Sequence, residues 1–185
     1  MKSMHRLHSH TRLFALLASI ALPFAAAQTR PVTAERIIAA DSEPQNWLAH
    51  GRTYGEQRYS PLKQVNDGNV EKLGLAWSYA TNSTRGLQAT PIVVDGRMYA
   101  TGVWSVVYAL DAKTGKELWT YDPQVPREWG RYACCDAVNR GVALWGDALY
   151  FATLDGRLIS LDARTGAKRW EINTIDRTKP YTITG

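Results

Sequence analysis

The stretch ALDAKTGKELW, residues 109–119, returns at residues 160–170 as SLDARTGAKRW. The two copies keep the same register, with corresponding residues 51 positions apart (160 − 109). The matched pairs are Asp111 and Asp162, Thr114 and Thr165, Gly115 and Gly166, and Trp119 and Trp170. Self-similarity at a fixed period of this order indicates a repeat architecture, in which each repeat is one supersecondary unit.

Each repeat is predicted to form four short antiparallel strands joined by tight turns. Asp95-Gly96 separates two apolar runs, and glycine tolerates the positive φ that a hairpin turn requires. Asp111 begins a second turn, where its carboxylate can accept from the backbone and Gly115 can take the strained position. The expected strands are 91–94, 97–101, 105–110 and 116–121 in the first repeat, and 141–145, 148–153, 157–161 and 167–173 in the second. An earlier, degraded repeat is expected to end at Trp77.

Such units are typical of the blades of a β-propeller, so the sequence predicts an all-β fold. We expect the closing tryptophan of each repeat to cover the gap to the next blade, with its indole N–H donating to a carbonyl there. Residues 28–185 have room for about three blades, whereas propellers close with roughly four to eight. We therefore expect a partial propeller, either as a fragment of a longer protein or in an assembly that completes the ring. The alternative is one β-sandwich with a coincidental duplication.

The N-terminus has the features of a cleavable secretory signal, which is predicted to be residues 1–27. Lys2, Arg6 and Arg12 form a basic region, residues 13–26 are apolar, and a run of three alanines offers a cleavage site. The mature chain is therefore expected in the periplasm. The alternative is an uncleaved membrane anchor, for which the apolar run is short.

The sequence after this signal carries little net charge. The formal charge of the chain is +5, and removing the three basic residues of the signal lowers it to +2 (5 − 3). No basic patch is left that would indicate nucleic-acid binding. No later apolar run is long enough to cross a membrane. We therefore expect no nucleic-acid partner and no transmembrane segment.

Two adjacent residues, Cys134 and Cys135, are the only cysteines of the chain. An exported protein can keep a disulfide, but two cysteines exclude a disulfide-dense small scaffold. A bond between neighbours closes almost no loop, so it would stabilise little and would serve instead as a rigid apolar wall. On the pairing alone, two buried thiols or an interchain bridge remain alternatives.

The segment WGRYACCDAVNRG, residues 129–141, resembles the vicinal-disulfide segment of the methanol and ethanol dehydrogenases that depend on pyrroloquinoline quinone (PQQ). Similarity to this quinoprotein family extends from about Asp41 onward. The other stretches that carry it are 46–47, 54–62, 87–91, 153–158 and 181–185. The resemblance implies an eight-bladed propeller, of which this chain would form about three blades.

The resemblance also implies a PQQ site near the propeller axis, against the ring of a Cys134–Cys135 disulfide. Arg140 matches an arginine that binds the carboxylate side of PQQ, a task that suits a planar guanidinium. Without the motif, Arg140 would be interpreted as part of a surface ion pair. Thr184 matches a threonine that contacts PQQ. Gln88 stands where the family usually has a glutamate close to the quinone; it keeps the acceptor oxygen but loses the charge, so we expect altered cofactor affinity or redox poise.

The family oxidises primary alcohols to aldehydes by hydride removal, with an aspartate as general base and Ca²⁺ or a lanthanide as Lewis acid, and cytochrome c accepts the electrons. None of the matching catalytic or metal-ligand positions falls within residues 1–185, so no catalytic residue and no metal ligand are predicted in this chain. Asp111, Asp155 and Asp162 are interpreted as turn residues, and His50 as an ordinary histidine. We expect an alcohol dehydrogenase fragment that alone neither oxidises alcohols nor binds PQQ tightly. The alternatives are a non-catalytic exported β-propeller scaffold and a truncated, inactive gene product.

Overall fold

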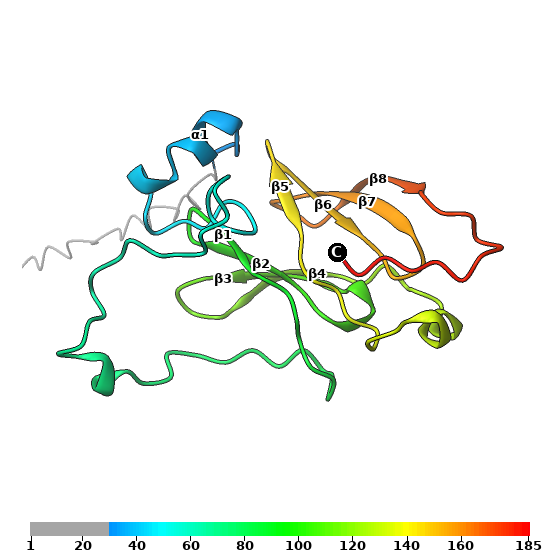
Figure 1. Cartoon of the computed structure of the whole chain (residues 1–185), viewed down its shortest axis with the longest axis horizontal. Helices are drawn as coiled ribbons and strands as arrows, with labels where there is room; N and C mark the ends of the chain where they lie inside the picture. The colour runs from blue at the N-terminus through cyan, green and yellow to red at the C-terminus, as the bar shows by residue number, and fades with distance from the viewer. Residues whose placement is uncertain (1–29) are drawn as a thin grey trace, which may run out of the picture.

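The computed structural model describes residues 30–185, which form two antiparallel four-stranded sheets (Figure 1). Neighbouring strands follow one another along the chain, in the orders β1-β2-β3-β4 and β5-β6-β7-β8. The strands are β1 Ile92–Val94, β2 Arg97–Thr101, β3 Val107–Asp111, β4 Glu117–Tyr121, β5 Ala143–Trp145, β6 Ala148–Ala152, β7 Arg157–Asp162 and β8 Lys168–Asn173. The helices are α1 Ala34–Ile38 and the short 3₁₀ helices η1 Ala40–Ser42, η2 Val70–Lys72, η3 Val103–Ser105 and η4 Arg127–Tyr132.

The two sheets repeat the same strand pairing. The β3–β4 register shifts after Ala109, and the β7–β8 register shifts after Ser160, which is the corresponding residue of the second repeat. A meander of four antiparallel strands per repeat is the form of one propeller blade. The predicted all-β fold is therefore confirmed, with one complete blade in each repeat.

The predicted strands agree with the observed ones to within two residues at each end. The expected start of a strand at Ser105 is wrong, because this residue ends η3. Trp104 and Ser105 have φ values of 60° and 61°, which a strand cannot contain. The hydroxyl of Ser105 accepts a hydrogen bond from the main-chain N–H of Leu154 at 3.1 Å, so a contact with the second sheet holds this conformation.

The second turn of each repeat is closed by its aspartate. Asp111 Oδ1 accepts from the main-chain N–H and the hydroxyl of Thr114 at 2.8 and 2.7 Å. Asp162 Oδ1 accepts from the same two groups of Thr165, both at 2.9 Å. The Arg169 guanidinium is the largest cause that lowers the pKa of Asp162, to about 2, and these turn hydrogen bonds add to it. The interpretation of these aspartates as turn residues is confirmed.

Trp119 connects the first sheet to the second. Its indole Nε1 donates to the carbonyl oxygen of Ala163 at 3.2 Å. Its ring covers Gly166, which has a φ of 74° and where a Cβ would lie 2.7 Å from the ring. The prediction that the closing tryptophan bonds to a carbonyl of the next blade is confirmed.

The degraded repeat expected to end at Trp77 forms no strand within the described residues before β1. Trp77 nevertheless docks on the first sheet as Trp119 docks on the second. Its Nε1 donates to the carbonyl of Ala112 at 3.2 Å, and its ring covers Gly115. The segment around it runs from η2 to β1 as a wide loop outside the sheets (Figure 1). Residues 30–185 therefore contain two complete blades, preceded by the docking tryptophan of a third unit.

The hydrophobic core lies between the two sheets. Full burial of one large aliphatic or aromatic side chain contributes about 1.5–3 kcal/mol, so contact between the sheets is the main source of cohesion. The buried members are Ile92, Val94, Tyr99, Val107 and Ala109 from the first sheet and Leu144, Leu149, Phe151, Ile159 and Leu161 from the second. Val32, Ile37 and Leu48 from the N-terminal segment, together with Val142 and Ala163 next to strands of the second sheet, complete the cluster.

The N-terminal segment is anchored on the turn between β1 and β2. The buried guanidinium of Arg36 bonds to Asp95 at 2.6 Å and to Glu43 at 2.8 Å. The main chain of Trp47 pairs with Val93 as an isolated antiparallel bridge. This segment therefore borders the first sheet along β1.

The predicted signal peptide, residues 1–27, lies outside the described residues. The predicted domain of residues 28–185 is described from residue 30 onward. Within that part of the chain, none of the helices has the length and apolar character that a membrane crossing requires.

Candidate cofactor site

The loop between the two sheets carries most of the predicted cofactor residues. Cys134 and Cys135 are exposed and joined by a disulfide, and Arg140 is also exposed. Residues 137–139, which lie between them, are buried. The loop is thus anchored at its centre and presents the disulfide on one side and a guanidinium on the other.

A second hydrophobic cluster supports this loop. Ala137, Trp129 and Leu154 are buried in it, and Ala133 packs against it. Trp129 belongs to η4 and meets Tyr132 edge to face, with 5.1 Å between ring centroids. Because the residues before and after the disulfide both belong to this cluster, the disulfide is held on a packed base.

The main chain of Arg140 lies between two other segments that the sequence singles out. Its N–H donates to the carbonyl of Thr184 at 2.7 Å, and its own carbonyl accepts from the N–H of Thr90 at 3.2 Å. The Arg140 guanidinium also donates to Thr184 Oγ1, across 44 positions of sequence. Gly141 has a φ of 140°, and a Cβ there would lie 3.2 Å from Thr90 O. The structure therefore brings the predicted residues Arg140 and Thr184 into direct contact.

Gln88 is exposed and lies two residues before Thr90, in the segment that bonds to Arg140. An ion pair between Arg85 and Asp136 joins the same segment to the residue that follows the disulfide. This pair is not evident from the sequence, because its two residues are 51 positions apart and no local pattern connects them. Two contacts thus align the Gln88 segment with the disulfide loop.

Two arginines of η4, which precedes the disulfide in the chain, lie over aromatic rings. Arg127 lies over the ring of Trp104, with 4.3 Å from the guanidinium carbon to the ring centroid. Arg131 lies over Tyr132 at 4.7 Å. Together with Arg140, they give residues 127–141 a formal excess of one positive charge over Glu128 and Asp136, which favours an anionic ligand.

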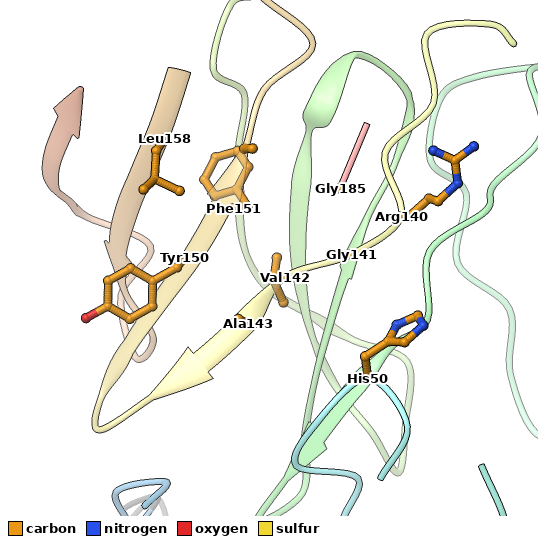
Figure 2. A pocket seen from close by; sticks show the side chains of 10 residues that line it. His50, Arg140, Gly141, Val142, Ala143, Tyr150, Phe151, Leu158 and Gly185 are labelled. Atoms are coloured by element: carbon orange, nitrogen blue, oxygen red, sulfur yellow. The ribbon is translucent and has the colours of Figure 1, made fainter. Parts of the chain in front are cut away.

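Arg140 also lines a pocket of about 460 Å³ (Figure 2). In Figure 2, side chains of β6 and β7 form one side of the pocket, and Arg140 and His50 lie on the other. The lining residues are His50, Arg140, Gly141, Val142, Ala143, Tyr150, Phe151, Ala152, Leu158 and Gly185. Cys134, Cys135, Gln88 and Thr184 are not among them, so Arg140 is the one predicted site residue that lines this pocket of the described chain.

The three segments carry groups of the kinds that bind a planar ligand with carboxylates. Arg140 offers a guanidinium, Thr184 a hydroxyl and Gln88 an amide, and donors of this kind recognise carboxylates. The exposed disulfide offers a rigid apolar surface to a flat ring. Within residues 30–185, no group of three or more His, Cys, Asp or Glu side chains is placed to hold a metal ion.

A buried asparagine next to Arg140 also escaped the sequence analysis. Asn139 is only 2% exposed and bonds to Ser105 in η3 of the first blade and to Ala152 in β6 of the second. A buried polar side chain of this kind requires partners, but its partners Ser105 and Ala152 lie 34 and 13 positions away. The WGRYACCDAVNRG motif contained the residue, yet nothing local distinguished it from a surface asparagine.

Comparison with known proteins places this geometry in a family. A family model described as "Glucose/ethanol/alcohol dehydrogenase, beta-propeller domain" matches residues 47–171. The quinohemoprotein alcohol dehydrogenase ADH-IIG of Pseudomonas putida is 57% identical over 174 residues, covering 92% of this chain and 24% of that protein. The 1-butanol dehydrogenase (cytochrome c) of Thauera butanivorans is 59% identical over 140 residues, covering 75% of this chain and 20% of that protein.

Solved structures show the same relationship. The structure of ADHIIG from Pseudomonas putida HK5 matches with a TM-score of 0.83 at 58% identity, covering 85% of this chain and 23% of that one. A europium-containing methanol dehydrogenase matches with a TM-score of 0.76 at 40% identity, covering 82% of this chain and 27% of that one. The chain therefore spans about a quarter of the length of the relatives it matches.

Proposed function

The chain belongs to the PQQ-dependent alcohol dehydrogenase family of β-propellers, and on this basis we propose that it supplies one wall of the PQQ site in an enzyme that oxidises primary alcohols to aldehydes. The observation that carries the proposal is the position of Arg140. Its main chain is bonded on one side to Thr90 and on the other to Thr184, next to the disulfide loop. The main chain of Arg140 is thus held by hydrogen bonds on both sides, and its exposed guanidinium is of the kind that binds a carboxylate.

Each residue of this wall has a distinct task in the proposal. Arg140 binds a carboxylate of PQQ through its planar guanidinium. Thr184 orients that guanidinium through its hydroxyl, which accepts the hydrogen bond from Arg140. Cys134 and Cys135 form a rigid surface against which the ring of PQQ stacks. Gln88 provides a neutral amide where other members of the family usually have a carboxylate.

When bound, PQQ would supply the two-electron oxidant for the alcohol. The aspartate base and the ligands of Ca²⁺ or a lanthanide would come from parts of the propeller outside this chain. The europium-containing methanol dehydrogenase among the structural relatives supports a metal of this class. A cytochrome c acceptor is supported by the name of the Thauera butanivorans relative. Export to the periplasm rests on the predicted signal of residues 1–27.

The test is a titration of the metal-loaded apoprotein with PQQ, in a protein that carries this segment within a complete propeller. Arg140→Ala should raise the dissociation constant of PQQ at least about tenfold, which corresponds to about 1.4 kcal/mol. The exposed Arg164, in the turn of the second repeat, is the matched control, and Arg164→Ala should leave it unchanged. Failure of the unsubstituted protein to bind PQQ would favour the non-catalytic scaffold instead.

A further inference from the structure

We propose that Asn139 is a positioning residue for the cofactor site, which fixes the main chain that carries Arg140 to both blades at once. The inference rests on the proposed role of Arg140 in binding PQQ. Asn139 itself is 2% exposed and so does not reach a ligand. It acts through its neighbour.

The side chain of Asn139 uses all of its hydrogen-bonding groups. Its Nδ2 donates to Ser105 Oγ at 3.2 Å and to the carbonyl of Ala152 at 2.8 Å. Its Oδ1 accepts from the N–H of Gly141 at 3.1 Å. Ser105 belongs to η3 of the first blade, and Ala152 ends β6 of the second. One amide group therefore bonds to both blades and to the residue just beyond Arg140.

The bond to Gly141 closes a local turn around Arg140. Because Asn139 and Gly141 are linked, the main chain of the intervening residue cannot swing without breaking a partly buried hydrogen bond. The hydroxyl of Thr101 adds a further restraint, since it donates to the carbonyl of Asn139 at 3.3 Å. The exposed guanidinium therefore extends from a main chain fixed from within the core.

Ser105 completes the arrangement at a cost in backbone energy. Its φ of 61° lies in the left-handed region, where a non-glycine residue is strained. Its hydroxyl accepts from Asn139 and from the N–H of Leu154 at 3.1 Å, which satisfies two buried donors. The strained backbone places the Ser105 hydroxyl between these two donors. We infer that the surrounding structure holds Ser105 in this conformation.

An asparagine is needed here because the site requires two donors and one acceptor. Aspartate has nearly the same shape, but it cannot donate to the carbonyl of Ala152 and would oppose it with a negative charge. Removing one partner of a buried hydrogen bond leaves the other polar group unsatisfied, which destabilises the structure around it. We expect the lost hydrogen bond to displace Arg140. Because Arg140 binds PQQ in the proposed function, its displacement should weaken PQQ binding.

The experiment is a double-mutant cycle on PQQ affinity, measured by quenching of tryptophan fluorescence in the metal-loaded apoprotein with a complete propeller. Asn139→Asp should raise the dissociation constant about tenfold in the unsubstituted background but less than about twofold when Arg140→Ala is also present. Ser105→Ala, which removes one acceptor and adds no charge, should follow the same pattern with about a threefold effect. Asn173→Asp, at the exposed end of β8, is the control and should have no effect.

Each result bears on the inference. A loss of affinity that is equally large in both backgrounds would overturn it, because Asn139 would then act through general stability and not through Arg140. Unchanged affinity in both Asn139→Asp and Ser105→Ala would also overturn it. If Asn139→Asp does not fold, the Ser105→Ala cycle decides alone. If Arg140→Ala itself leaves PQQ affinity unchanged, the proposed function fails, and the inference fails with it.

Discussion

Tyr99 and Trp119 donate hydrogen bonds to the same acceptor, the carbonyl oxygen of Ala163 in the neighbouring blade. The hydroxyl lies 3.0 Å and the indole nitrogen 3.2 Å from that oxygen. The two residues flank Ala109 across β3, and their ring centroids are 6.0 Å apart. The small side chain of Ala109 leaves room for both rings to reach across the gap. One buried carbonyl therefore joins two strands of the first blade to the turn of the second.

The shared acceptor predicts that Tyr99→Phe and Trp119→Phe are coupled in their effect on stability. Each single change should lower the free energy of unfolding by about 1–2 kcal/mol, since the other donor still satisfies the carbonyl of Ala163. The double change leaves this buried carbonyl without either donor, so its cost should exceed the sum by about 1 kcal/mol. Urea denaturation of the four proteins measures the coupling. A Tyr99→Phe and Trp145→Phe cycle is the control and should be additive, because Trp145 is 50% exposed.

Tyr99 also predicts a loss of stability at alkaline pH. Burial raises the pKa of Tyr99 to about 12, whereas it titrates near 10 in the unfolded chain. The protonated hydroxyl therefore stabilises the fold fully below pH 10, and this contribution is lost as the pH rises toward 12. The loss should be about 2–3 kcal/mol in the free energy of unfolding. In Tyr99→Phe, the free energy of unfolding should depend less on pH between about pH 10 and 12, as urea denaturation at each pH would measure. An unchanged dependence in this variant would contradict the raised pKa of Tyr99.

The turn glycines predict different costs for the same substitution. Gly166→Ala places a Cβ 2.7 Å from the ring of Trp119 and also forces alanine to a φ of 74°. Gly146 has a φ of 63° with no atom within 4 Å of its Cβ position. Gly146→Ala should therefore cost only about 1–2 kcal/mol for the left-handed backbone, and Gly166→Ala should cost about 1–3 kcal/mol more for the clash. Equal urea midpoints for the two variants would contradict the docking geometry of Trp119.

Loss of the Cys134–Cys135 disulfide is expected to weaken cofactor binding while changing the stability of the fold only slightly. Replacing Cys134 and Cys135 together by serine should lower the free energy of unfolding by less than about 1 kcal/mol, because the bond closes almost no loop. The same change should weaken PQQ binding, because it removes the rigid apolar surface. Reduction of the unsubstituted protein is the control and should reproduce the weaker binding. Two free thiols in peptides from unreduced, oxidised protein would contradict the bond.

The substitution Gln88→Glu, which adds a negative charge at this position, is expected to change how the enzyme binds PQQ and the reduction potential of bound PQQ. In the metal-loaded enzyme with a complete propeller, Gln88→Glu should change the dissociation constant of PQQ by about threefold to tenfold and lower the reduction potential of bound PQQ, because a carboxylate disfavours added electrons nearby. Gln64→Glu, on the exposed segment before η2, is the control. Unchanged affinity and turnover in Gln88→Glu would show that this position does not act on the cofactor.

The parts of the fold that follow from local sequence were predictable. The repeated turn of Asp162 to Gly166 needs only a carboxylate, nearby N–H groups and a glycine, all within five residues. Strand positions followed from apolar runs between such turns. The expected strand start at Ser105 was wrong because its conformation is held by Leu154 and Asn139, which are 49 and 34 positions away. A degraded repeat ending at Trp77 was expected from a fragment of the motif, but no strand forms within the described residues before β1.

The sequence by itself determined the repeat and the blade form, which are properties of residue type and spacing along the chain. The candidate residues Gln88, Cys134, Cys135, Arg140 and Thr184 came from the resemblance of their segments to the quinoprotein family. Only the tertiary structure decided that Arg140 lies between Thr90 and Thr184, that Arg85 pairs with Asp136, and that a buried amide bonds to both blades. Contacts of this kind join residues far apart in the chain, and they form only after the blades pack. No pattern of neighbouring residues therefore specifies them.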